Sequence, residues 1–351
     1  MSKIKVAVIF GGNSTEYEVS LKSAASVLEN IDRDKYEIIM LGITRGGKWL
    51  RYNGDIEKIR NNTWHMDNCC YPAVISPCRD IKGIIEILPE NSYLNIDIDV
   101  AFPVMHGKYG EDGTIQGLLE MAGIPYVGCG TLSSAICMDK DIAHTLAEAN
   151  GIRVPHSMPL HRSYDEGKVH LFAEAYGFPI YVKPVKSGSS IGIVKANNEK
   201  ELYSGIDNAF KYDDKVLLEE NIPGFEVGCA VLGNDEIVLG DVDEVEITKG
   251  FFDYGEKYSL ETSRIHLPAR LDCTTIDEIK KTAAKLYKIL ECKGFARIDM
   301  FIKPDKEIVF NEVNTIPGFT SKSRYPSMLI STGMTYSKII DNLIALAQMD
   351  N

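Results

Sequence analysis

Apolar and polar residues alternate along residues 296–315 (ARIDMFIKPDKEIVFNEVNT), which predicts two strands joined by a short polar turn. If this hairpin is symmetric about Asp305–Lys306, Asp299 faces Glu312. Asn314 then lies on the same face as Glu312, because side chains alternate along a strand. Opposed like charges repel. Either this face is simply exposed to solvent, or its two carboxylates and its amide bind a hard cation such as Mg²⁺.

The first third of the chain predicts a parallel sheet covered by helices. Residues 5–31 have the pattern of a strand, a glycine turn and a helix, and further apolar strands follow at 36–44 and 97–107. This β-α-β order is typical of parallel sheets. A helix and a short strand are expected within 113–128, whereas residues 51–95 are too irregular to assign.

The pattern changes near Cys129, and two further modules are expected. The first has a helix ending at Gly151, then strands, a helix and another strand; the second has strands on both sides of a long helix. That helix is expected to begin at a capping box of Thr275 and Glu278 and to end before a C-cap at Gly294. The predicted domains are 1–128, 129–222 and 223–351.

The stretch YVKPVKSGSSIGIV (181–194) is a candidate anion site. Lys183 lies late in a strand and precedes a loop rich in glycine and serine, whose backbone N–H groups could form a nest around phosphate. The loop lacks the Walker A order, and GGNSTE near the N-terminus lacks a G-x-G-x-x-G fingerprint. An ordinary hairpin turn remains the alternative.

Composition narrows the class of protein. The 351 residues are 44% hydrophobic and 25% charged, and the net charge is −12, which argues against nucleic acid as a main partner. No apolar run reaches membrane-spanning length, and the short apolar run at the N-terminus predicts a first strand rather than a signal peptide. The eight cysteines lack zinc spacing. We therefore expect a cytoplasmic protein with reduced thiols and no membrane association.

Several long motifs occur in the order typical of one family. VKPVKSGSSIG, EKYSLETS, GFARIDMF and FNEVNTIPGFTS, with GGNSTEYEVSL, HGKYGEDGTIQGLLEMAGIPYVG and MDK before them, resemble the D-alanine–D-alanine ligase family over nearly the whole chain. The resemblance implies an α/β ATP-grasp fold with a Rossmann-like N-terminal domain. It also implies a reaction in which the carboxylate of D-alanine attacks the γ-phosphate of ATP and an amine then attacks the acyl phosphate.

The resemblance also implies roles for individual residues. Mg²⁺ (two ions) or Mn²⁺ would be held by Asp299, Glu312 and Asn314. ATP would contact Lys140, Lys183, Lys257, Glu219 and Glu226, the last two at adenine and ribose. Catalysis would use Glu16, Ser189, Tyr258, Arg297 and the Gly318 N–H, and His106 would face the substrate. Each of these could instead be an ordinary surface or structural residue, as Arg297 would be if it only pairs with Asp299.

Two segments bear on the second substrate. In the loop 247–265, a candidate lid, Lys257 and Tyr258 resemble the enzymes that form a peptide bond, which favours an amine nucleophile. In TSKSRYPSM (320–328), Ser323 is followed by Arg324 where an aliphatic residue is usual in housekeeping ligases. This resembles the D-alanine–D-serine ligases of vancomycin resistance, of the VanG type.

An arginine near the second subsite would favour a substrate with a hydroxyl. Ser323 would belong to the same subsite, and Asp243 and Phe252 could line it. Arg324 could instead pair with a carboxylate and never meet substrate. The leading hypothesis is therefore a ligase of D-alanine and D-serine for peptidoglycan precursors, and a homodimer by analogy. The alternatives are an ordinary D-alanine–D-alanine ligase, a different ATP-grasp ligase, and an inactive ATP-binding regulator.

Overall fold

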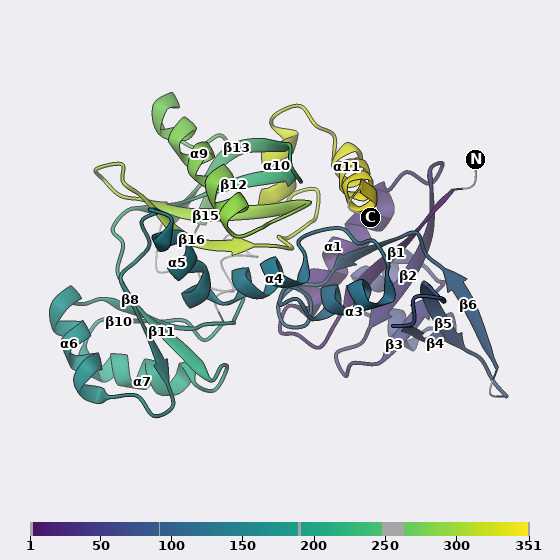
Figure 1. Ribbon diagram of the computed structural model, residues 1–351, viewed down its shortest axis with the longest axis horizontal. Helices are drawn as coiled ribbons and strands as arrows, with labels where there is room; N and C mark the ends of the chain where they lie inside the picture. Colours follow the sequence, from purple (N-terminus) through teal and green to yellow (C-terminus); the bar gives the residue numbers. More distant parts are fainter. Residues whose placement is uncertain (1–2, 91, 189–190, 248–262, 350–351) are drawn as a thin grey trace.

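The computed structural model describes residues 3–90, 92–188, 191–247 and 263–349. Its strands form three sheets, which lie in three separate parts of the molecule (Figure 1). Most of the predicted lid (residues 248–262 of 247–265) and four predicted site residues (Ser189, Phe252, Lys257 and Tyr258) lie outside the described residues.

The first sheet has seven strands in the order β6-β5-β4-β3-β2-β1-β7. Its strands are β1 (Ile4–Gly11), β2 (Tyr36–Ile43), β3 (Trp49–Tyr52), β4 (Cys70–Ile75), β5 (Gly83–Ile87), β6 (Tyr93–Asp97) and β7 (Val100–Val104). Only β1, β2 and β7 are parallel, as the β-α-β pattern predicts. The segment 51–95, which the sequence left unassigned, extends the sheet by antiparallel strands.

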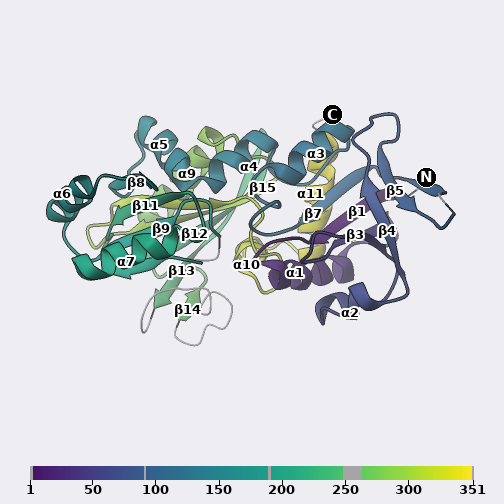
Figure 2. The same cartoon turned by 90° about the horizontal axis from the view of Figure 1, so that it is seen from below.

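Helices cover both faces of this sheet. These are α1 (Tyr17–Asn30), α2 (Ile56–Arg60), the 3₁₀ helix η1 (Trp64–Met66) and α3 (Thr114–Ala122). Because side chains alternate along β1, Val6, Val8 and Phe10 face the core that contains α1, whereas Ala7 and Ile9 face α3. Accordingly, α1 and α3 lie on opposite sides of the sheet (Figure 2).

The helices α4 (Thr131–Met138) and α5 (Lys140–Ala149) lead to a four-stranded sheet in the order β10-β9-β11-β8. Its elements are β8 (Ser157–His161), α6 (Glu166–Tyr176), β9 (Ile180–Pro184), β10 (Val194–Ala196), α7 (Glu199–Ala209) and β11 (Lys215–Glu220). The predicted strands at Lys183 and beyond the Gly/Ser turn are therefore confirmed as β9 and β10, which pair antiparallel.

The third sheet has the order β14-β13-β12-β15-β16. It is built from β12 (Phe225–Gly233), β13 (Ile237–Ile247), β14 (Ser263–His266), β15 (Phe295–Ile302) and β16 (Ile308–Asn314). The helices α9 (Cys273–Ile289), α10 (Arg324–Ile330) and α11 (Tyr336–Met349) complete this part of the chain. The final helix α11 packs into the same core as β1, β7 and α1 of the first sheet.

The predicted ends of α9 are wrong, although its buried stripe is confirmed. The N-cap is Asp272, whose carboxylate accepts from the Thr275 N–H at 3.0 Å, and Thr275 lies inside the first turn. The helix ends at Ile289 with Leu290 as C-cap. Gly294 instead has a φ of +66° and lies so close to Gly128 that a Cβ would be 3.0 Å from its backbone nitrogen. A turn and a close backbone approach therefore require this glycine.

No helix among the residues described is both long and apolar enough to cross a membrane.

Candidate active site

The acidic pair of the hairpin is present as predicted. Asp299 on β15 is directly opposite Glu312 on β16, and Asn314 follows on the same strand. Asp299 is almost completely buried; it accepts two hydrogen bonds from Arg297, both 2.7 Å, and one from the Asn314 amide at 2.9 Å. Burial opposes charge on Arg297, but Asp299 outweighs it and raises the Arg297 pKa.

The donor set at this position fits a magnesium ion. Two carboxylates on adjacent strands and the side-chain oxygen of Asn314 are hard oxygen ligands, and Mg²⁺ typically takes one or two carboxylates together with phosphate and water. Within the described ranges no group of three His, Cys, Asp or Glu side chains could hold a metal. Any magnesium site here therefore needs the amide, or a ligand's own oxygens.

Two lysines lie between the acidic pair and the predicted phosphate loop. Lys140, the first residue of α5, is 3.4 Å from Glu312 and donates to the Ser187 carbonyl at 3.0 Å. Lys183 on β9 pairs with Glu219 on β11 at 2.5 Å. Burial would lower the pKa of Lys183, but the adjacent Glu219 carboxylate outweighs burial and raises it. Lys140 therefore contacts the start of the loop directly, and Lys183 lies one residue before the end of the strand that leads into it.

His144 is a buried residue of this region that the sequence reasoning missed. Its Nε2 is 2.7 Å from the Asn311 carbonyl, and its Nδ1 is 3.9 Å from Glu219. Burial lowers its pKa, so the ring is neutral near pH 7. The available signal was its position four residues after Lys140, because residues i and i+4 share a helix face.

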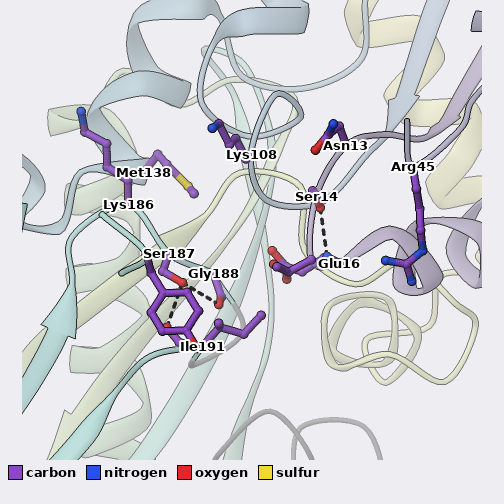
Figure 3. A pocket seen from close by; sticks show the side chains of 12 residues that line it. Asn13, Ser14, Glu16, Arg45, Lys108, Met138, Lys186, Ser187, Gly188 and Ile191 are labelled. Carbon is purple, nitrogen blue, oxygen red and sulfur yellow. Dashed lines mark hydrogen bonds between the residues drawn. The ribbon is translucent and has the colours of Figure 1, made fainter. Parts of the chain in front are cut away.

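Glu16 lies just before α1, at the edge of a cavity of about 340 Å³ between the N-terminal loop and the loop after β9. Figure 3 shows the Ser14 hydroxyl accepting a hydrogen bond from the Glu16 backbone N–H, with Gly188 on the opposite side of the Glu16 side chain. A Cβ on either Gly107 or Gly188 would be 2.4 Å from the Glu16 carboxylate. Glycine at these two positions therefore lets two loops from different parts of the chain approach one carboxylate.

His106 joins the first sheet to the loop after β16. Its Nδ1 is 2.8 Å from the Ile316 carbonyl and its Nε2 is 3.1 Å from the Ser23 hydroxyl. Ser23 also accepts from the Phe319 N–H at 3.2 Å. Burial lowers the pKa of His106 to about 4. The neutral ring therefore donates from Nδ1 and accepts at Nε2, next to the loop that contains Gly318.

Glu111 reinforces the same connection and was also missed. Its carboxylate accepts from the Gly107 N–H at 2.8 Å and from the Ile316 N–H at 3.1 Å. Burial, with the nearby Glu16 charge, raises its pKa. The only sequence signal was its place as the single glutamate of the HGKYGEDG loop (106–113). Gly318 thus lies in a loop whose Ile316 backbone is held by two side chains, His106 and Glu111, from the loop that follows β7.

Arg324, the predicted second-subsite residue, forms ion pairs that are largely shielded from solvent. Its Nε and Nη2 donate to the two oxygens of Asp243 at 2.7 and 2.8 Å, and its Nη1 donates to Glu226 at 2.7 Å. Asp299 lies 3.6 Å from Nη2. These carboxylates raise the pKa of Arg324 against the opposing effect of burial. Arg324 therefore pairs with carboxylates, and these pairs join residues predicted for ribose, metal and substrate, whereas its contact with substrate stays a prediction. Neighbouring Ser323 accepts from the Thr320 N–H at 3.0 Å.

Two family profiles match this chain. The profile for "D-ala D-ala ligase N-terminus" matches residues 5–129, and that for "D-ala D-ala ligase C-terminus" matches residues 146–345. The chain belongs to the D-alanine–D-alanine ligase family. The structural neighbours of this ligase have the ATP-grasp fold, so the predicted α/β ATP-grasp class is confirmed.

Individual relatives of this ligase differ in the substrates that their names state. A D-alanine–D-alanine ligase of Caldicellulosiruptor bescii is 47% identical, over 99% of this chain and 96% of its own. The vancomycin C-type resistance protein VanC1 of Enterococcus gallinarum is 44% identical, over 99% of both. The crystal structure of the VanG D-Ala:D-Ser ligase from Enterococcus faecalis is 53% identical over 99% of this chain and 100% of that one, with a TM-score of 0.91.

Proposed function

We propose that this ligase joins D-alanine to D-serine at the expense of ATP, in the synthesis of peptidoglycan precursors that confer vancomycin resistance. The observation that carries the proposal is Arg324, whose guanidinium lies against Asp243 and next to Asp299, beside the predicted metal site. A polar group at the second subsite discriminates in favour of a substrate hydroxyl. The 53% identity to a VanG D-Ala:D-Ser ligase supports the same substrate.

The roles proposed for the metal-binding and nucleotide-binding residues follow from the charges of their side chains and of the ligand groups that they would contact. Asp299, Glu312 and Asn314 would hold Mg²⁺ or Mn²⁺ (two ions), which would neutralise charge on the phosphates. Lys140, Lys183 and Lys257 would bind those phosphates, and Glu219 and Glu226 would accept from adenine and ribose. The protein itself contributes position and charge, which is most of what phosphoryl transfer requires.

The remaining residues would orient the two amino acids. Glu16 would bind the ammonium group of D-alanine, in a network with Ser189 and Tyr258. The D-alanine carboxylate then attacks the γ-phosphate and ADP leaves, and the amine of D-serine attacks the carbonyl of the resulting acyl phosphate with loss of phosphate. Arg297 and the Gly318 N–H would stabilise the tetrahedral oxyanion. His106, Asp243, Phe252, Ser323 and Arg324 would contact substrate.

We further propose that residues 1–128, 129–222 and 223–351 are the three domains, with ATP between the second and third, and that the enzyme is a cytoplasmic homodimer. Each sheet of the fold falls within one of these ranges.

The second candidate is an ordinary D-alanine–D-alanine ligase, which the 47% identity to the Caldicellulosiruptor bescii enzyme favours. Phosphate release is measured with D-alanine alone and then with D-serine added, and the dipeptides are separated. We expect faster release and mainly D-Ala-D-Ser when both amino acids are limiting. Equal or slower release with D-serine, and D-Ala-D-Ala as the product, would reject the D-serine proposal.

A further inference from the structure

Acidic residues form a row across four strands of the third sheet, and one position in it has no side chain. Gly228 on β12 pairs with Asp243 on β13 and with Asp299 on β15, and Asp299 pairs in turn with Glu312 on β16. The row is therefore Asp243, Gly228, Asp299, Glu312. Without a compensating cation, neighbouring carboxylates in such a row would repel.

Arg324 from α10 supplies that cation above the glycine. A Cβ on Gly228 would be 2.7 Å from Arg324 Nη2 and 2.8 Å from Asp243 Oδ1. Gly228 also donates its backbone N–H to Asp243 at 2.9 Å. The missing side chain thus makes room for the guanidinium between two carboxylates.

The two edges of the guanidinium are held differently. Asp243 binds Nε and Nη2 together, a fork that fixes the plane of the group. Glu226, two residues before Gly228 and on the same face of β12, binds Nη1 by one hydrogen bond of 2.7 Å. The Nη1 edge is therefore the one that can change partner while Asp243 keeps the group in place.

We propose that Arg324 couples the binding of nucleotide to the binding of the second amino acid. This inference rests on the proposed function, which assigns Glu226 to the ribose and Arg324 to the second subsite. When ribose hydroxyls donate to Glu226, they compete with Nη1 for its oxygens. An Nη1–H is then released to donate to the hydroxyl or carboxylate of the incoming amino acid. ATP and D-serine therefore each strengthen the binding of the other, because such coupling is reciprocal.

The test measures affinity rather than turnover. The dissociation constants of a non-hydrolysable ATP analogue and of its 2′,3′-dideoxy form are measured by calorimetry on the full chain, with and without D-serine. Mg²⁺ and the D-alanine that fills the first subsite are held constant. We expect D-serine to lower the dissociation constant of the ribose analogue roughly 5-fold or more, which is the lower end of usual coupling. The dissociation constant of the dideoxy analogue should change by less than about 2-fold, which is below that range.

Two variants distinguish coupling through Glu226 from a general effect of losing a negative charge. Glu226→Gln removes the competing carboxylate, so D-serine should no longer change the affinity for the ribose analogue. Glu244→Gln is the matched control: it lies next to Asp243 on β13 and breaks the 2.5 Å pair with Arg270 instead. Because alternate residues face opposite sides of the sheet, it leaves Arg324 untouched and should retain the coupling.

The outcomes distinguish this inference from the proposed function. In one outcome, D-serine changes the affinities for the ribose and dideoxy analogues equally or changes neither, and D-alanine as second substrate also fails to distinguish the two analogues. Arg324 then does not couple the two sites. If D-alanine as second substrate tightens the ribose form selectively while D-serine has no effect, the coupling stands and the D-serine assignment fails.

Discussion

Asp299 and Glu312 face each other because β16 contains a bulge at Asn311. Met300 pairs with Phe310, yet the next pair along is Asp299 with Glu312, so Asn311 is an extra residue in the strand. In an unbroken register Asp299 would face Asn311, and Glu312 would point to the other side of the sheet. The carboxylate pair therefore depends on one irregularity in the hairpin.

Replacing Glu312 tests the proposed metal site. Glu312→Gln keeps the shape of the side chain but removes a negative charge from the site, so we expect ligation to fall by roughly 10²-fold or more, as with other losses of an electrostatic catalytic group. The Mg²⁺ concentration needed for half-maximal phosphate release should rise. Glu307→Gln, at the exposed turn of the same hairpin, changes only a pair with Lys303 and is the control. An unchanged cation dependence in Glu312→Gln would remove the metal site from the proposal.

Gly228→Ala should disturb the site by steric overlap alone, because it changes no charge and removes no hydrogen-bonding group. The new Cβ would meet Arg324, Asp243 and Met328 within 3 Å, and we expect a cost of about 1–3 kcal/mol, the usual range for overpacking. Urea unfolding measures this cost, and the KM for D-serine should rise in parallel. Gly46→Ala is the control, because the nearest atom to its Cβ is 3.9 Å away. A Gly228→Ala protein as stable as the control would mean that Arg324 is not tightly packed.

Asp243 and Arg324 should behave as a unit in a double-mutant cycle. Arg324→Met leaves the fully buried Asp243 without its cation, which we expect to cost about 3–5 kcal/mol of folding stability. Asp243→Asn keeps the acceptor for the Gly228 N–H, so adding it to Arg324→Met should recover part of that loss. Strictly additive effects in urea unfolding would show that the pair is not energetically coupled.

His106 should make the folded state sensitive to acid. Its pKa is about 4 when folded, against about 6.5 when unfolded. Between these values the unfolded chain binds a proton that the folded chain does not, so the stability present above pH 6.5 is lost as the pH falls towards 4. The loss amounts to about 3 kcal/mol.

His106→Asn removes the titrating group and should flatten this part of the pH profile of urea unfolding. His170→Asn, at an exposed position of α6, is the control and should follow the wild type. If His106→Asn lost stability between pH 6.5 and 4 as steeply as the wild type, the acid sensitivity would belong to other groups.

Local patterns were enough for much of the fold. The alternation around Asp299 predicted the hairpin, and the spacing of apolar residues predicted the buried face of α9. They failed at the ends of that helix, where Asp272 rather than Thr275 is the cap. They also failed for 51–95, because its strands have only four to six residues, too few for a clear apolar alternation, and β6 at the edge of the sheet is exposed along nearly its whole length.

The sequence by itself determined the family, the order of strands and helices in most of the chain, and the residue types of the acidic cluster, because these depend on neighbours in the chain. Only the tertiary structure decided that Arg324 lies over Gly228 between Asp243 and Glu226, that His144 lies beside Glu219, and that Glu111 holds the Ile316 loop. Such contacts join residues about 75 to more than 200 positions apart. They follow from sheet order, strand register and the packing of helices and loops from other parts of the chain, which no local pattern encodes.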